Sequence, residues 1–541
     1  MKRFFLFFLV SSLVVNAFAL ANDKQGTDYF KAGFSDVAKP LLIKEFQSDT
    51  MSRSETSFYL GNIYFEANQK DSASYYFNKG INALPLNSLN AVGIAMLKIK
   101  SSPAEAETDF KNLLKIKGNN KNQLLLIAIS RAYLINGDIA NAIVYQEKAR
   151  ALKQKSAAVS VLLGDIHLAK KELGPACSNY EEAILYDENC KEAYIKYARA
   201  YKNANPTLAI EMLNRLKQKE PTFLLADKEL AGIYYKENNF EKAAKSYEIY
   251  VQSGNSNIED LTQYAFLLFL NHEFGKSLDI TNKGLVKSPR NPAFNRLAMY
   301  NYTNLKQYDE ALKAADLFYK QTDKPKFTSL DYSCYGQALR ETKQTALAIT
   351  QFEKALSLDS SKVELRKDIS DMYNDKNDYV NAISNYQLYM KSFAEDKKTA
   401  DMYVNLGKMY YFLGSTDSIA VNLKKTSLHH ADSIFAKSAI LYPTDYRSNY
   451  YRAKTNFALD PENGSAKPYY EQTLALVESK ANPKFNPIII ECSRFLGYYY
   501  FLKEDYTQSK VYWNKILAID SKNDIANKAM DGIEKTLKKK K

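Results

Sequence analysis

A 34-residue interval recurs along the 541-residue chain and restricts the folds that the chain can adopt. Phe240, Phe274 and Tyr308 are spaced at this interval, and a small residue follows each of them three positions later. An aromatic and a small residue in fixed phase indicate a repeat array, in which each unit packs only on its neighbours. The chain can therefore exceed the size of an ordinary hydrophobic core without dividing into many independent domains.

Each repeat unit has the pattern of two amphipathic helices joined by a short turn. In residues 230–250, apolar residues recur at intervals of three and four on both sides of Asn238-Asn239. A small residue such as Ala243 lets two helices approach closely, and a large aromatic such as Tyr247 fills the adjacent space. The low content of 19 Gly and 14 Pro agrees with helices linked by short turns. The pattern predicts an all-α fold.

The order of large and small residues in each unit resembles the tetratricopeptide repeat. One unit contains Leu60-Gly61, Tyr64, Ala73, Phe77, Gly80 and Pro85. Other units begin at Leu163-Gly164, Tyr335-Gly336, Leu406-Gly407 and Leu496-Gly497. The resemblance extends over roughly a dozen or more units and nearly the whole chain after its leader. It implies a right-handed superhelical solenoid of antiparallel helix pairs, with the first helix of each pair on the concave side.

The succession of repeats predicts the organisation of the chain. We expect a signal peptide at 1–21, N-terminal capping helices at 22–53, the N-terminal part of the array at 54–320, its C-terminal part at 321–520, and a C-terminal capping helix with a Lys-rich tail at 521–541. The C-terminal part contains an insertion at 415–430, because Tyr410 and Ala431 are about a dozen residues further apart than the repeat requires. Insertions in solenoids often carry function, and tolerated surface variation is the alternative.

The N-terminus has the layout of a secretory signal peptide. Lys2 and Arg3 precede an apolar segment that begins at Phe4, and small-x-small sites end at Ala19 and Ala21. We expect the leader to be cleaved, and its retention as a membrane anchor is the alternative. No further membrane span is predicted. No two Cys residues are spaced for a plausible disulfide, so an exported chain of this kind fits a bacterial periplasm or secretion from a bacterium.

Four Asp-Ser/Thr-apolar triplets begin at Asp49, Asp71, Asp417 and Asp432. They resemble the O-glycosylation acceptor of exported Bacteroidetes-type proteins, and the capping of helices by Asp and Ser is the alternative explanation. Together with the leader, the triplets make the chain similar to an exported, Bacteroidetes-like member of the tetratricopeptide-repeat family.

The sequence contains no recognisable catalytic or metal-binding set. It has no glycine-rich phosphate loop, nucleophile elbow or His-Glu-x-x-His motif. His429 and His430 are adjacent in the insertion, without a Cys or a convincing acidic partner. The net charge of +13 is interspersed apart from the tail at 535–541, which favours a solvated surface over nucleic-acid binding. We predict no enzyme, no cofactor and no metal, and an unrecognised enzyme is a remaining alternative.

The resemblance also implies where a partner would bind. In the family, residues just past the large-small pair of each first helix line the concave groove, which receives an extended peptide or a partner helix. The corresponding residues are Asn62, Phe65, Arg131, Tyr235, Phe269, Arg340, Lys408, Tyr411, Tyr498 and Phe501. Packing against the next repeat is the alternative for several of them. We expect a non-enzymatic protein-protein interaction scaffold or adaptor of the bacterial periplasm or cell envelope; the alternative is polysaccharide or cell-wall polymer binding.

Overall fold

The computed structural model describes residues 25–49, 53–83, 88–153, 155–252, 254, 256–321 and 326–539. Within these ranges it contains 29 α-helices, three short 3-10 helices and no β-strand. The predicted signal peptide at 1–21 lies outside the described residues. None of the helices that the structure describes combines the length and the hydropathy that a membrane span requires.

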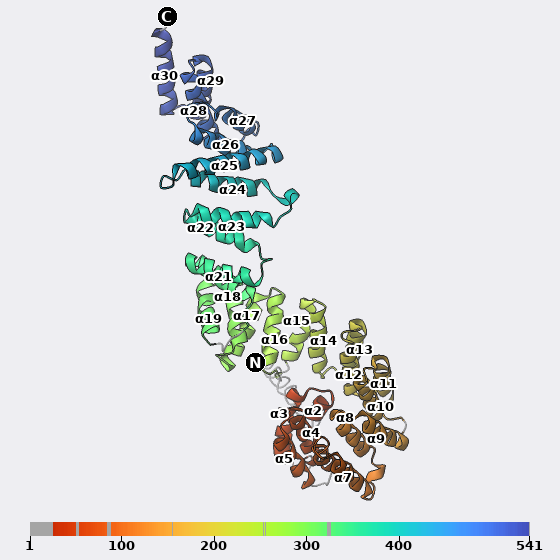
Figure 1. Cartoon of the computed structure of the whole chain (residues 1–541). Helices are drawn as coiled ribbons and strands as arrows, with labels where there is room; N and C mark the ends of the chain where they lie inside the picture. The colour runs from red at the N-terminus through yellow and green to blue at the C-terminus, as the bar shows by residue number, and fades with distance from the viewer. Residues whose placement is uncertain are drawn as a thin grey trace, which may run out of the picture. The chain divides into compact units, whose positions relative to one another are not determined.

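The chain forms two compact units, and the boundary between them falls inside α18 (Pro292–Asn304). Figure 1 labels most of the helices described below. Unit 1 ends at Asn301 and unit 2 begins at Tyr302. In unit 1 the helix pairs are α2 (Gln25–Lys31) with α3 (Ser35–Ser48), α4 (Arg53–Glu66) with α5 (Lys70–Ile81), α6 (Leu89–Met96) with α7 (Pro103–Lys115), α8 (Gln123–Ile135) with α9 (Ile139–Leu152), α10 (Ala157–Ala169) with α11 (Leu173–Tyr186), α12 (Lys191–Tyr201) with α13 (Pro206–Lys219), α14 (Leu225–Lys236) with α15 (Phe240–Val251), and α16 (Ile258–Leu270) with α17 (Phe274–Lys287). The 3-10 helix η1 (Asn119–Lys121) precedes α8.

Unit 2 continues the same succession of helices. After α19 (Tyr308–Gln321) come α20 (Ser329–Glu341) with α21 (Thr345–Leu358), α22 (Glu364–Asp375) with α23 (Tyr379–Lys391), α24 (Ala400–Gly414) with α25 (Val421–Leu441), α26 (Tyr446–Leu459) with α27 (Lys467–Glu478), α28 (Asn486–Leu502) with α29 (Tyr506–Ile519), and the terminal α30 (Asp524–Lys539). The 3-10 helices η2 (Glu395–Lys397) and η3 (Pro483–Phe485) precede α24 and α28.

Within each unit, the helix pairs pack on the pairs before and after them. For example, α10 contacts α11 of its own pair, and also α8, α9 and α12 of the adjacent pairs. This nearest-neighbour packing is that of a helical solenoid. The predicted all-α solenoid of antiparallel helix pairs is confirmed.

At the glycine of the large-small pair, an aromatic ring packs so closely that there is no room for a side chain. A Cβ atom on Gly164 would lie 2.5 Å from the Tyr180 ring, and one on Gly61 would lie 2.3 Å from the Phe77 ring. The same Phe77 ring would lie 2.3 Å from a Cβ on Gly93, in the next pair. One buried ring therefore fills the space between consecutive pairs, and any side chain at the glycine would occupy that space.

We expect Gly164→Ala to lower the free energy of unfolding of unit 1 by about 1–3 kcal/mol, because the added methyl group overlaps the buried Tyr180 ring. The matched control is Gly232→Ala in α14, where no atom would lie within 4 Å of the new Cβ. The better helix propensity of Ala should stabilise this control by up to about 1 kcal/mol. Urea denaturation followed by circular dichroism measures both changes. Equal losses in the two variants would contradict the packing role of Gly164.

The turn within a helix pair is usually short, and its central residue is left-handed. Asn238, His272 and Lys306 occupy this central position in three successive turns, with φ of 56°, 59° and 60°. Gly137 occupies the same position in the turn between α8 and α9. Asn and Gly adopt this conformation at little cost, whereas Lys adopts it because the packed helices on both sides impose it.

The connection between α24 and α25 departs from this turn. Residues 415–420 link the two helices, and residues 421–430 of the predicted insertion form the first part of α25. At 21 residues, α25 is the longest of the described helices. The additional residues thus divide between a longer link and an N-terminal extension of a helix.

Candidate functional site

The predicted groove residues of the first half of unit 1 are used in packing and ion pairing. Asn62 is buried, and its side-chain amide donates to the Phe58 carbonyl at 2.7 Å. Phe65 packs against the buried cluster that contains Val92. Arg131 donates to the carboxylate of Glu192 at 2.8 Å, from α8 to α12.

Arg131 and Glu192 belong to a network of charged side chains that links α8, α10 and α12. Lys196 lies 2.9 Å from Glu192 and also pairs with Asp165 of α10. The Tyr180 hydroxyl donates to Asp165 at 2.9 Å. Burial acts to raise the pKa of Glu192, but the positive charges of Arg131 and Lys196 hold it below its ordinary value. Each charged side chain of this network therefore has a partner of opposite charge within unit 1, and none of them needs a ligand for this purpose.

Three further predicted residues lie in α14, α16 and α20. Tyr235 is exposed and lies beside the rings of Phe240 and Phe266. Phe269 contacts the rings of Phe274 and Tyr300. Arg340 forms ion pairs with Asp368 at 2.7 Å and with Glu341 at 2.8 Å. None of these three residues lines either of the two cavities described below.

The last four predicted residues lie in unit 2, where the structure brings two of them together. Tyr411 of α24 and Tyr498 of α28 line the same cavity. Lys408 places its Nζ atom 5.6 Å from the centroid of the Tyr451 ring. Phe501 packs on Tyr506 at the side of the terminal cluster, with 5.6 Å between ring centroids.

The cavity shared by Tyr411 and Tyr498 has a volume of about 650 Å³ and is called the aromatic groove below. Most of its apolar lining comes from first helices of successive pairs, namely Tyr411, Phe457, Phe495, Tyr498, Tyr499 and Leu502, and Tyr470 of α27 adds to it. Its charged lining consists of Lys454, Glu462, Glu491, Arg494 and Lys503. The size is that of a small-ligand or peptide side-chain pocket.

Several apolar side chains of the aromatic groove face solvent. Phe457 is 45% exposed, Tyr498 is 50% exposed and Leu502 is 77% exposed. The Phe495 ring supports this surface from below, since it stacks on Tyr470 with 4.4 Å between centroids and meets Phe457 edge-on at 5.7 Å. Contiguous exposed apolar groups rimmed by charges mark interaction sites.

Some charged side chains of the aromatic groove have a partner of opposite charge, and Arg494 has none in the described part of the chain. Glu491 accepts a hydrogen bond from the Tyr450 hydroxyl at 2.6 Å and lies 3.5 Å from the Lys454 ammonium. Arg494 is one turn further along α28, and no carboxylate of the described residues lies within ion-pair distance of it. Arg494 is thus a cation available to a ligand.

Phe457, Arg494 and Phe495 were not among the residues predicted from the sequence. Arg494 stands four positions before Tyr498, so the helical repeat places both on one face of α28. That spacing could have identified Arg494. Phe457 lies in a degenerate unit at 447–478 that lacks the large-small pair. The position of Phe457 within the repeat, and therefore the face of the helix that it occupies, could not be assigned from the sequence.

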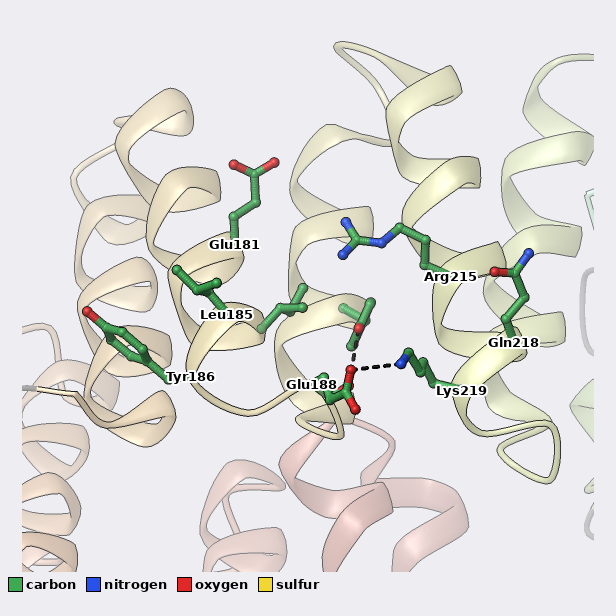
Figure 2. Close-up of a pocket in the computed structure, with 9 residues that line it drawn as sticks. Glu181, Leu185, Tyr186, Glu188, Arg215, Gln218 and Lys219 are labelled. Atoms are coloured by element: carbon green, nitrogen blue, oxygen red, sulfur yellow. Dashed lines mark hydrogen bonds and ion pairs between the residues drawn. The ribbon is translucent and has the colours of Figure 1, made fainter.

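A second cavity, of about 610 Å³, lies along α11, α12 and α13 in unit 1 (Figure 2). Figure 2 shows Glu188 paired with Lys219. The two charged groups lie 2.7 Å apart, and the Tyr194 hydroxyl donates to the Glu188 carbonyl at 3.1 Å. This cavity is open and polar, and Glu188 and Lys219 in its lining neutralise each other. In the part of the chain that the structure describes, no three His, Cys, Asp or Glu residues are grouped as metal ligands.

Comparisons with known proteins identify one repeat unit by sequence and several similar solved structures. A family model described as tetratricopeptide repeat matches residues 335–362. A solved structure of the C-terminal part of a TPR repeat-containing protein from Cytophaga hutchinsonii is 26% identical, with 50% of this chain and 99% of that chain covered and a TM-score of 0.40. A tetratricopeptide repeat protein from Parabacteroides merdae is 18% identical, with 46% and 98% covered and a TM-score of 0.31. The APC/C hetero-tetramer Cut9-Hcn1 contains a chain that is 12% identical, with 89% and 96% covered and a TM-score of 0.28.

A search of curated protein sequences finds no match. The family-model match covers α21 and most of α20, the pair in which a Cβ on Gly336 would lie 2.6 Å from the Phe352 ring. The same interlocking of a glycine with an aromatic recurs at Gly61, Gly164, Gly407 and Gly497. Residues 335–362 are thus a tetratricopeptide repeat by sequence, and the packing of this unit recurs along the described chain.

Proposed function

We propose that this protein is a non-enzymatic scaffold of the bacterial periplasm or cell envelope, and that it holds a protein partner in the aromatic groove of unit 2. Tetratricopeptide repeats indicate a protein-interaction scaffold. The layout of residues 1–21 supports export, which osmotic-shock fractionation with N-terminal sequencing of the mature chain tests.

The observation that carries the groove proposal is the exposed apolar surface of Phe457, Tyr498 and Leu502 within one cavity. Full burial of one such side chain is worth about 1.5–3 kcal/mol, so a partner that covers all three gains a substantial binding energy. Arg494 at the same surface favours a partner segment that carries a carboxylate beside its apolar anchor. An extended peptide and the apolar face of a helix both fit this chemistry.

The test uses the full chain as bait for cross-linking capture from an envelope fraction, followed by titration of the purified partner. We expect Phe457→Ala/Tyr498→Ala to weaken partner binding at least about 10-fold, because aromatic anchors dominate interface energies. The matched control is Tyr75→Ala/Leu358→Ala, which removes two exposed apolar side chains outside the groove.

Equal affinity of the groove variant and the control variant would remove the aromatic groove from the proposal. Sedimentation with purified cell-wall polymer tests the alternative ligand in parallel. Polymer binding that the groove variant loses and the control variant keeps would replace the protein partner with a polysaccharide.

A further inference from the structure

The first helix pair of unit 1 also contacts helices that lie far along the sequence. α2 contacts α12 as well as its neighbours α3 and α4 (Figure 1). The Tyr29 ring meets the Phe223 ring at 5.5 Å, and the Arg199 guanidinium lies 4.4 Å from the centroid of the Phe34 ring. Tyr29 and Phe34 are each 4% exposed, so this contact excludes water.

Polar groups on α12 recognise the two ends of α2. The Lys191 ammonium lies 2.9 Å from the Asp28 carboxylate in the first turn of α2. At the other end, Arg199 Nη1 donates to the carbonyls of Ala32 at 3.0 Å and Gly33 at 3.2 Å. A cation at a helix C-terminus satisfies carbonyl groups that have no partner within the helix.

The first turn of α3 is recognised in the same manner. The Asp36 carboxylate lies 3.7 Å from the Lys228 ammonium of α14 and accepts from the Asn257 side-chain amide at 3.4 Å. The Asp28 and Asp36 side chains are 38% and 51% exposed. These contacts are therefore open to solvent at their edges, although their aromatic centre is buried.

Each cation that contacts α2–α3 also has a carboxylate partner within the array. Lys191 lies 3.6 Å from Glu220, Arg199 lies 2.6 Å from Glu229, and Lys228 lies 2.7 Å from Asp260. Departure of α2–α3 would consequently leave none of these three cations without a counter-charge, so opening this contact does not carry the cost of an uncompensated charge. α2 has seven residues and is too short to be stable alone, because isolated helices under about 12–15 residues are marginal in water.

We propose that the face formed by α12, α14 and Phe223 is a helix-docking surface, which α2–α3 occupies at rest and which a partner helix takes in exchange. The geometry defines the partner as a helix with a carboxylate in its first turn and an aromatic residue just past its last turn. Lys191 binds the carboxylate, and Arg199 binds the last carbonyls and covers the aromatic ring. This surface lies within unit 1 and is independent of the aromatic groove.

The probe for this surface is a fluorescein-labelled peptide with the sequence of residues 25–49, titrated against the full chain by anisotropy. In Asp28→Lys/Asp36→Lys, the internal pair loses both acidic contacts while the docking surface keeps its residues. We expect this variant to bind the peptide at least 10-fold more tightly than the wild type. The charge-matched control is Asp71→Lys/Asp309→Lys, at exposed positions without an ion pair among the described residues, and should bind like the wild type.

Charge reversal tests the surface itself. Adding Lys191→Glu to the Asp28→Lys/Asp36→Lys chain should abolish binding of the peptide, because a carboxylate at position 191 repels the peptide's Asp28 and attracts the ammonium introduced at position 28 of the chain itself. Peptide binding that is equal in all chains, or absent from all of them, would overturn the proposal.

Hydrogen exchange is an independent test of whether α2–α3 leaves its surface. If the amides of α2–α3 are as protected in the Asp28→Lys/Asp36→Lys chain as in the wild type, the helix pair is a permanent part of the core and the proposal is wrong. Should that variant misfold, Asp28→Asn with the same exchange measurement decides the question.

Discussion

Replacing Glu192 with glutamine is expected to lower the free energy of unfolding of unit 1 by about 3–5 kcal/mol, because breaking a buried ion pair leaves charge uncompensated. The Glu192 side chain is 10% exposed and faces Arg131 at 2.8 Å and Lys196 at 2.9 Å. Urea denaturation at pH 7 measures the change. The matched control is Glu107→Gln, whose i,i+4 pair with Lys111 is solvent-exposed and contributes about 0.3–0.5 kcal/mol. Equal effects of the two substitutions would contradict the role of the network.

The same variant carries a pH signature. The pKa of Glu192 is held below its ordinary value by Arg131 and Lys196 against the opposing effect of burial. A depressed pKa stabilises the fold at pH values above the unfolded pKa of about 4.3, and this contribution is lost as the pH falls through the folded value. The difference between wild type and Glu192→Gln should therefore shrink as the pH falls below about 4. A difference of constant size from pH 7 to pH 3 would assign the effect to packing.

Phe435→Ala is expected to destabilise unit 2 by about 3–5 kcal/mol, because removal of a buried aromatic ring leaves a cavity. The Phe435 ring is 0% exposed, stacks on Tyr451 with 5.4 Å between centroids, and fills the space over Gly407. Differential scanning calorimetry of the full chain should show the loss in the transition assigned to unit 2.

The control for Phe435 is another phenylalanine of unit 2. Phe457 is 45% exposed at the aromatic groove, so Phe457→Ala should change the stability by less than about 1 kcal/mol. Its effect should fall on partner binding instead. If Phe435→Ala were as mild as Phe457→Ala, the ring between consecutive pairs would not be the element that holds them together.

The sequence predicts well those features of the fold that depend on contacts between residues close together in the chain. Gly164 and Tyr180 lie on the two helices of one pair, α10 and α11, and their interlocking follows from the fixed length of these helices and the turn between them. The phase of the repeat is therefore sufficient to predict helices, turns and core residues. The fold class and the resemblance to the tetratricopeptide repeat follow from this local information.

The surfaces proposed here as binding sites depend on contacts that the 34-residue period does not encode. Arg131 and Glu192 are 61 residues apart, and Asp28 and Lys191 are 163 residues apart. Such pairs form only because of the way that unit 1 curves, which small rotations between successive pairs determine. In unit 2 the phase placed Tyr411 and Tyr498 correctly on first helices, but only the packed structure shows that Phe457 joins them in one cavity.

The short turn with its left-handed central residue also bears on how such a chain evolves. A turn of fixed length and handedness cannot gain or lose a residue without misaligning both helices, so single insertions and deletions there are selected against. Duplication of a whole repeat unit leaves every turn unchanged and adds one more layer to the stack. The longer link at 415–420 has no left-handed central residue, and it is free of that restriction. New sequence is accordingly expected to enter such arrays as complete units, or at links of this second type.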